Sequence, residues 1–160
     1  YDMYQDIPAL EIGSSNKIKG ISYDAFLIKY KEYIEEEKKI NEILNTTTKR
    51  FILKSKNKLI GEVGIRTTLN DFWINKGSQI YYKIRLSERN KGYGNTILFL
   101  VLKEAKKLGF KKIRINCNDK NIFSKKIIIK NGGIVDIKSY KTNDGFSSSY
   151  IIDLKDVKNK

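Results

Sequence analysis

Histidine, cysteine and proline are scarce in this chain, and their scarcity argues against several kinds of site. The 160 residues include no histidine, one cysteine (Cys117) and one proline (Pro8). A single cysteine rules out an intrachain disulfide, and the absence of histidine argues against a zinc site, so we expect no metal. No apolar run is long enough to cross a bilayer, and no charged-then-apolar leader opens the chain. We expect no membrane association and a cytoplasmic location, although a chain that begins at Tyr1 leaves open a leader on a precursor.

Lysine and arginine, by contrast, are abundant and give the chain a formal net charge of +14. A charge of this size fits a partner such as nucleic acid or an acidic membrane surface. The lysines are spread along almost the whole chain, however, without a block of five or six and without a basic stripe interleaved with aromatic residues. A composition rich in lysine, isoleucine and asparagine explains the excess better than nucleic-acid binding does.

Length and hydrophobic content indicate a single domain over residues 1–160. With 40% hydrophobic residues, a chain of this length can bury one core. Residues 1–20 have weak periodicity and are expected to wrap onto the domain, and residues 155–160 are expected to fray.

The most informative stretch runs from Gln79 to Gly109 and contains a strand pattern, a basic glycine loop and an apolar-faced helix. Apolar and polar residues alternate from Gln79 to Leu86, which is typical of a strand with one buried face. The loop Arg89–Gly94 then places two glycines where the helix begins. Glycines there let backbone N–H groups approach a ligand, and the helix dipole adds partial positive charge, so the loop is typical of a phosphate site.

The order of these elements resembles the GNAT family of N-acetyltransferases. Arg89-Asn90-Lys91-Gly92-Tyr93-Gly94 matches the family's Arg/Gln-x-x-Gly-x-Gly/Ala loop, and Asn121 opens a second helix that ends in a pair of glycines. Gly61–Arg66 and Ile84–Arg89 also resemble a bacterial subgroup of predicted acetyltransferases, and the likeness covers nearly the whole chain.

The resemblance implies an α/β fold of the α+β type, the GNAT fold. Its mixed central sheet is expected to splay between the strands at 79–86 and 112–117, with flanking helices and with the pantetheine arm of acetyl-CoA in the gap. In the family, the glycine loop holds the pyrophosphate of coenzyme A. For Asn121, a purely structural helix cap explains the residue as well as a ligand contact does. The resemblance places these residues on the cofactor: Ile84, Arg85, Leu86, Arg89, Asn90, Lys91, Gly92, Tyr93, Gly94, Asn121 and Ser124.

Acetyl transfer to an amine requires removal of a proton, because a lysine-type amine has a pKa of about 10.4 and is mostly protonated at neutral pH. With no histidine, the base is expected to be a carboxylate, acting directly or through water, or to be absent. Glu62 is the first candidate because its strand adjoins the cofactor strand, and Asp71 is the second; for both, a surface or salt-bridged carboxylate is the alternative. Many family members carry an acidic tyrosine seven residues after the asparagine, but Ile128 stands there and cannot donate. Cys117 is expected to be a small buried core residue.

These expectations lead to an N-acetyltransferase that passes the acetyl group of acetyl-CoA to a primary amine by direct attack in a ternary complex. The acceptor is expected to be a small molecule or a peptide, and the protein a monomer or homodimer. A noncatalytic acyl-CoA-binding module is the alternative, favoured by the missing tyrosine and histidine. The loop assignment also predicts that Gly94→Glu abolishes cofactor binding and leaves the fold largely intact.

Overall fold

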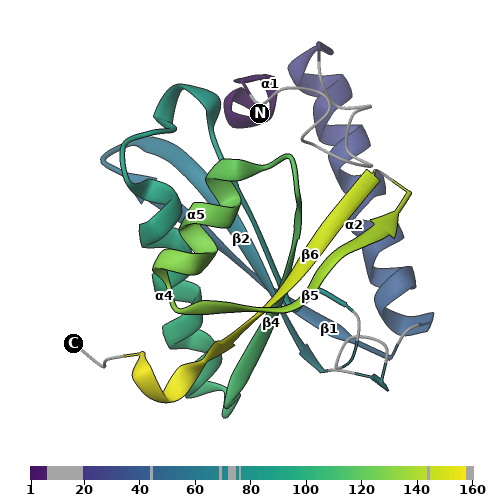
Figure 1. Cartoon of the computed structure of the whole chain (residues 1–160). Helices are drawn as coiled ribbons and strands as arrows, with labels where there is room; N and C mark the ends of the chain where they lie inside the picture. Colours follow the sequence, from purple (N-terminus) through teal and green to yellow (C-terminus); the bar gives the residue numbers. More distant parts are fainter. Residues whose placement is uncertain are drawn as a thin grey trace.

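The computed structural model describes residues 1–6, 20–43, 45–68, 70–71, 75, 77–143 and 145–157. Figure 1 shows strands that cross at the centre of the molecule, with α4 and α5 on one side and α2 on the other. The elements, in chain order, are α1 (Asp2–Asp6), α2 (Tyr23–Ile43), β1 (Thr47–Ser55), β2 (Lys58–Thr68), β3 (Ile80–Ile84), the 3-10 helix η3 (Leu86–Glu88), α4 (Tyr93–Lys107), β4 (Lys112–Asn118), α5 (Ile122–Lys130), β5 (Gly133–Thr142), β6 (Gly145–Asp153) and the 3-10 helix η4 (Leu154–Asp156).

The strands of the described chain form two three-stranded sheets. In the first sheet, β1, β2 and β3 lie side by side in that order, and both pairs are antiparallel. In the second sheet, β6 lies between β4 and β5 and pairs antiparallel with both. β3 and β4 are therefore edge strands of different sheets, and the crossover through α4 connects them.

A short joint holds β3 and β4 together at one end. The backbone N–H of Gln79 donates to the carbonyl oxygen of Arg114 (2.9 Å), and the backbone N–H of Arg114 donates to Oε1 of Gln79 (2.6 Å). Beside them, the backbone N–H of Asn116 donates to Oγ of Ser78 (3.1 Å). Beyond this joint no ladder pairs β3 with β4 among the described residues. The predicted splay between the strands at 79–86 and 112–117 is confirmed. The described strands form two separate antiparallel sheets, whereas a single mixed sheet was expected.

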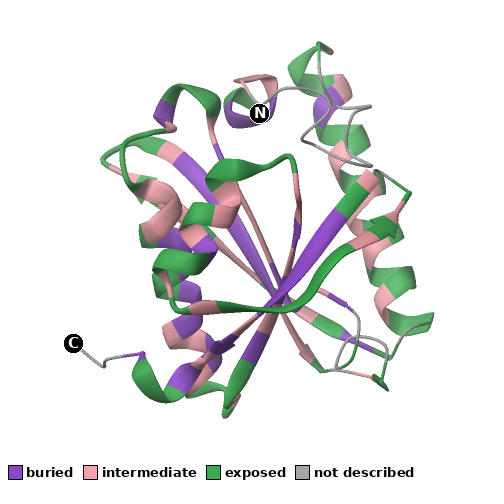
Figure 2. Ribbon diagram, in the orientation of Figure 1, coloured by how far each residue is buried: buried purple, intermediate pink, exposed green. Residues whose placement is uncertain are grey.

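Side chains alternate along β2 between two environments. Val63 and Ile65 face α4 and belong to the main core, whereas Glu62 and Gly64 face α1 and α2. Figure 2 shows the buried residues concentrated on the central strands and on α4, while α2 and β5 are mostly exposed. The main core also includes Ile80, Ile84, Ile97, Leu98, Val101, Leu102, Ala105, Ile113, Ile115, Ile128, Tyr150 and Ile152.

Two element boundaries near the glycine loop differ from the sequence prediction. β3 ends at Ile84, because the next residues leave the strand and form η3. The following helix begins at Tyr93, because Gly92 caps it in a left-handed conformation with φ of +84°. The loop is therefore shorter and more tightly curved than the sequence suggests.

The two ends of the chain are ordered over their described residues. At the N-terminus, Met3 and Tyr4 of α1 are buried and pack with Phe26 of α2. Residues 7–19, which include Pro8, lie outside the described residues. At the C-terminus, Val157 is buried and its carbonyl accepts a hydrogen bond from Nζ of Lys106 (2.8 Å). The fraying of residues 155–160 stays a prediction, and residues 158–160 lie outside the described chain.

Candidate active site

A tight loop connects β3 to α4 and contains two residues in the left-handed region. Asn90 has φ of +60° and Gly92 has φ of +84°. Left-handed residues in such a loop turn successive backbone N–H groups toward one point, and this concave arrangement binds anions. Tyr93 begins α4 directly afterwards, so the positive end of the helix dipole faces the same space.

The backbone N–H groups of residues 90–94 have no hydrogen-bond acceptor among the described residues. The N–H groups on either side are used within the protein. That of Arg89 donates to the carbonyl of Leu86 (3.1 Å), and that of Asn95 donates to the carbonyl of Gly92 (3.0 Å). The loop therefore offers five consecutive backbone donors to a ligand.

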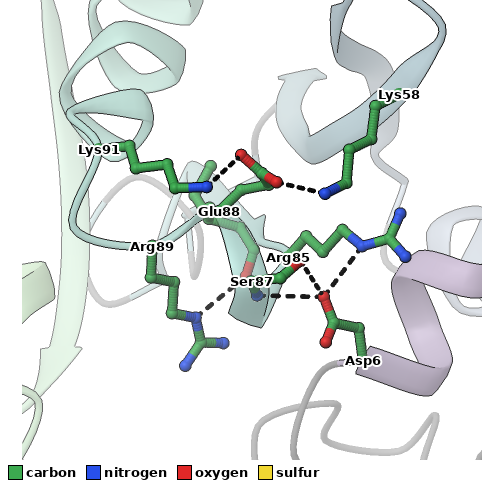
Figure 3. Close-up of polar contacts among 8 residues, drawn as sticks. Asp6, Lys58, Arg85, Ser87, Glu88, Arg89 and Lys91 are labelled. Carbon is green, nitrogen blue, oxygen red and sulfur yellow. Dashed lines mark hydrogen bonds and ion pairs between the residues drawn. The ribbon is translucent and has the colours of Figure 1, made fainter.

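Glu88, the last residue of η3, connects the loop to β2 through its carboxylate. Its carboxylate is buried and accepts hydrogen bonds from Nζ of Lys58 and from Nζ of Lys91 (3.0 Å), as Figure 3 shows. These two hydrogen bonds hold the pKa of Glu88 below its ordinary value. The contacts fix Lys91 beside the loop and tie the loop to the start of β2.

Asp6 braces the same region from α1. Its Oδ2 accepts hydrogen bonds from Oγ of Ser87 (2.7 Å), from the backbone N–H of Ser87 (3.1 Å) and from Nε of Arg85 (2.9 Å), also visible in Figure 3. The Ser87 hydroxyl, followed by the other two donors, lowers the pKa of Asp6. Arg85, one of the predicted cofactor residues, thus has its guanidinium held by the protein, while the neighbouring Leu86 side chain is exposed.

One edge of β3 is open toward the gap between the sheets. The backbone N–H of Arg85 donates to the carbonyl of Ile60 in β2 (2.8 Å), and hydrogen bonding alternates along the strand. Tyr82 and Ile84 therefore direct their backbone groups away from β2, toward the gap. No described strand pairs with this edge, although Nε of Arg89 donates to the carbonyl of Ile84 (3.1 Å). The edge is suited to a ligand that contains amide groups.

Tyr82 also reaches across the gap with its side chain. Its hydroxyl lies 2.7 Å from Oγ of Ser124 in the first turn of α5. Burial raises the pKa of Tyr82 to about 12. Asn121 caps α5, because its side chain accepts a hydrogen bond from the backbone N–H of Ser124 (3.0 Å), so its capping role is confirmed.

Two other residues near the gap belong to the core. Ile128, at the position of the family's tyrosine, is fully buried. Cys117 is also buried in the main core, and burial raises the pKa of its thiol. The prediction of Cys117 as a core residue is confirmed.

Glu62 lies on the face of β2 opposite α4 and is only 8% exposed. The hydroxyl of Tyr4 donates to its Oε2 (2.7 Å), and burial together with this carboxylate raises the pKa of Tyr4. Oε1 has no hydrogen-bond partner in the described structure, and no ion pair joins Glu62 to a described cation. The surface and salt-bridge alternatives for Glu62 are therefore wrong within the described chain. Asp71 is exposed, and its catalytic role stays a prediction.

Comparison with family models identifies this arrangement. A model described as an acetyltransferase (GNAT) domain matches residues 21–134. The chain belongs to the GNAT acetyltransferase family. This GNAT protein therefore contains an acetyltransferase domain. Among curated proteins, none matches the chain.

Several solved structures resemble the GNAT protein in fold. One is a Salmonella typhimurium protein described as an acetyltransferase and solved with acetyl-CoA, with 12% identity, a TM-score of 0.58, and coverage of 78% of this chain and 74% of that one. A mutant of the Vibrio cholerae spermidine N-acetyltransferase has 17% identity, a TM-score of 0.58 and coverage of 78% of each chain. An aminoglycoside acetyltransferase in complex with coenzyme A and kanamycin has 16% identity, a TM-score of 0.55 and coverage of 66% of each chain. At these identities the likeness shows the fold.

One glycine of the GNAT loop has a packing role besides its predicted place in the loop. A Cβ atom on Gly94 would lie 2.5 Å from Cδ1 of Ile127 in α5. Gly94 therefore leaves room for the end of the Ile127 side chain, which would have to shift in Gly94→Glu. That this variant leaves the fold largely intact stays a prediction. Gly92 has no atom within 4 Å of such a Cβ, so its glycine serves the left-handed backbone instead.

Sequence reasoning did not identify a group of side chains around Gly64, on the face of the first sheet opposite α4. We call Arg50, Glu62, Gly64 and Tyr81 the Gly64 cluster. A Cβ on Gly64 would lie 2.3 Å from Cζ of Tyr81, so the tyrosine ring lies over the glycine. A glycine in the interior of a strand often marks such a close approach, so the glycine at position 64 was the feature of the sequence that could have indicated the cluster.

The described ranges contain no group of three histidine, cysteine, aspartate or glutamate residues that could hold a metal ion. Among the helices in those ranges, none is both long and apolar enough to cross a membrane.

Proposed function

We propose that this GNAT acetyltransferase acts as a single cytoplasmic domain over residues 1–160 and acetylates the primary amine of a small molecule or peptide by direct attack in a ternary complex. One observation carries the proposal. A row of backbone N–H groups at residues 90–94 follows β3 in the chain, and the adjoining strand β2 carries a buried carboxylate, Glu62, whose Oε1 has no hydrogen-bond partner in the described structure.

The loop at residues 90–94 would hold the pyrophosphate of acetyl-CoA. Each hydrogen bond to a charged group contributes about 1.5–3 kcal/mol and a helix end about 0.3–1 kcal/mol, whereas micromolar affinity needs a net free energy of about 8 kcal/mol after ordering costs. At the lower end of these contributions the loop needs further contacts to reach that affinity. The open backbone of Tyr82 and Ile84 would bind the amide groups of the pantetheine arm and supply the remainder. When bound, acetyl-CoA supplies the acetyl group as an activated thioester.

Glu62 would take the proton of the amine at Oε1. The other oxygen is already bonded to the hydroxyl of Tyr4, which fixes the orientation of the carboxylate. A positioned general base contributes roughly 10²–10⁴-fold to the rate.

Tyr82 would donate a proton to the sulfur of the departing coenzyme A. Its pKa of about 12 keeps the hydroxyl protonated at neutral pH. The contact with Ser124 would hold that hydroxyl beside the first turn of α5. Tyr82 thus offers on β3 the donor that Ile128 does not offer on α5.

Calorimetric titration with acetyl-CoA beside dephospho-CoA and ATP, followed by a thiol-release assay with a panel of amines, tests the proposal. We expect saturable one-to-one binding that prefers acetyl-CoA, and thiol release that depends on an amine. Equal binding of every polyphosphate would contradict the cofactor site. Binding without turnover on any amine would favour a noncatalytic acyl-CoA-binding module. Ile128 is consistent with that function, because it is buried and offers no proton donor at the position of the family's tyrosine.

A further inference from the structure

Buried polar atoms without a hydrogen-bond partner are concentrated on one face of the first sheet. The described chain contains six such side-chain atoms, and five of them belong to Thr48, Arg50, Glu62 and Tyr81. Of these five, Nη2 of Arg50 is engaged in an ion pair with Glu37. Unsatisfied buried groups are rare in native proteins, and a cluster of them indicates a place where a polar ligand is bound.

Strand pairing brings three of these residues around Gly64. Gly64 is paired with Arg50 of β1 on one side and with Tyr81 of β3 on the other. Glu62 lies two residues before Gly64 and therefore on the same face of β2. The Arg50 side chain is 23% exposed, so the Gly64 cluster reaches the protein surface. Tyr81 belongs to β3, the strand that borders the gap, and its ring lies over Gly64 of the neighbouring strand β2.

Charges of both signs lie around the Gly64 cluster. Among the described residues, Arg50, Arg66 and Lys83 supply three positive charges, and Glu37 and Glu62 supply two negative ones. Arg66 donates to the carbonyl of Ser78 and lies 5.9 Å from the Tyr81 ring centroid; Nζ of Lys83 lies 5.6 Å from the ring centroid of Tyr4. A ligand with one positive and one negative group fits this arrangement better than a ligand with several positive groups.

We infer that the acceptor is an amine that also bears a carboxylate, as a free amino acid does, an inference that rests on the proposed transferase function. The ammonium end meets Oε1 of Glu62 and the hydroxyl of Tyr81, and the carboxylate meets Nη1 of Arg50. Each of these three atoms lacks a hydrogen-bond partner in the described structure, and the zwitterion provides a complementary group for each.

Polycationic acceptors are disfavoured by the same charges. Spermidine and aminoglycosides, which give two of the structural neighbours their names, would bring several positive charges close to the cations Arg50 and Lys83. The chain as a whole carries +14 and adds to that repulsion.

The experiment compares acceptors in matched pairs by thiol release from acetyl-CoA. Glycine, β-alanine and 4-aminobutyrate are each measured beside the amine that lacks the carboxylate: methylamine, ethylamine and propylamine. Spermidine and kanamycin serve as polycations. We expect at least one carboxylate-bearing amine to exceed its partner by about tenfold or more in kcat/KM, as a hydrogen-bonded ion pair would provide.

Arg50→Gln is then measured with both members of the preferred pair. We expect the variant to abolish the preference by lowering kcat/KM for the carboxylate-bearing amine only. Glu37→Gln is the matched control, because it breaks the ion pair of Arg50 with α2 and leaves Nη1 in place. A folding defect would lower both rates in the pair, so the ratio isolates recognition of the carboxylate.

Two different failures are distinguishable. Higher kcat/KM for simple amines, spermidine or kanamycin would overturn the inference and leave the transferase function standing. An unchanged preference in Arg50→Gln would also overturn it. No thiol release with any acceptor, from a protein that binds acetyl-CoA, would overturn both the inference and the proposed function.

Discussion

The loop before α4 and the Gly64 cluster are built from different parts of the chain. The loop is a single stretch, residues 90–94, and its donors are backbone N–H groups. The cluster is made of side chains from three strands, and its atoms meet only because the strands pair in one register. The loop should therefore tolerate side-chain changes that keep the backbone conformation, whereas the cluster should be sensitive to the loss of single side-chain atoms.

The largest expected effect is on catalysis, from Glu62→Gln. The amide cannot take the amine proton, so we expect kcat to fall by about 100-fold or more, within the range for a lost general base. Acetyl-CoA affinity should not change, because Glu62 faces away from the loop. Steady-state thiol release and calorimetry measure the two quantities. Tyr4→Phe, which removes only the hydrogen bond to Oε2, should have a smaller effect on kcat.

The second effect is on the loop, from Gly92→Ala. An alanine is strained at φ of +84°, so the N–H row shifts and the acetyl-CoA Kd should rise by about tenfold. Gly109→Ala is the matched control: Gly109 has φ of +88°, and like Gly92 it has no atom within 4 Å of an added Cβ. Both variants should lose about 1–2 kcal/mol of unfolding free energy. An equal change in Kd for both would contradict the role of the loop.

A third, smaller effect is expected in the Gly64 cluster, from Gly64→Ala. The added Cβ would overlap the Tyr81 ring, which would have to swing away from its place over the strand. We expect the KM of the amine to rise severalfold with an unchanged acetyl-CoA Kd. Tyr81→Phe, which removes only the hydroxyl, should reproduce part of the rise. A normal KM in both variants would show that the amine binds elsewhere.

The smallest effect is a pH-dependent one, from Glu88→Gln. The hydrogen bonds from Lys58 and Lys91 lower the pKa of Glu88 in the folded protein, so its contribution to stability is present above the ordinary value of 4.5 and is lost as the pH falls through the lowered pKa. Thermal unfolding at neutral pH should therefore show a lower Tm for the variant than for the wild type. The difference should close in acid, and a difference that stayed constant at every pH would contradict the assignment.

Elements that are determined by residues close to one another in the chain could be predicted from the sequence. The period-two pattern before the loop, the glycines at the start of α4 and the asparagine cap of α5 each act within a few residues, and the structure has these elements with shifted boundaries. The splay was predicted from family resemblance, and the joint at Gln79 that holds one end of it together was not. Gln79 joins the sheets because its side chain bonds a residue 35 positions away.

The Gly64 cluster could not be predicted because its residues are neighbours only across strands. Glu62 was a candidate from its strand, but its burial and its bond to Tyr4 depend on α1 folding back over the sheet. The glycine at position 64 indicated a close approach of another group to the strand, but nothing in the neighbouring sequence shows that this group is Tyr81. The same reason explains the packing role of Gly94, because Ile127, whose side chain lies against it, is in α5 and distant in the sequence.

Calorimetric titration of acetyl-CoA into the wild type, Gly92→Ala and Glu62→Gln, with thiol release measured on the same preparations, tests most directly that cofactor and amine are held by two separate parts of the protein. We predict that Gly92→Ala weakens acetyl-CoA binding by about tenfold while Glu62→Gln binds it as the wild type does and loses turnover. If Glu62→Gln weakened acetyl-CoA binding as much as Gly92→Ala, or turned over amines normally, the division into a backbone site for the cofactor and a side-chain site for the amine would be wrong.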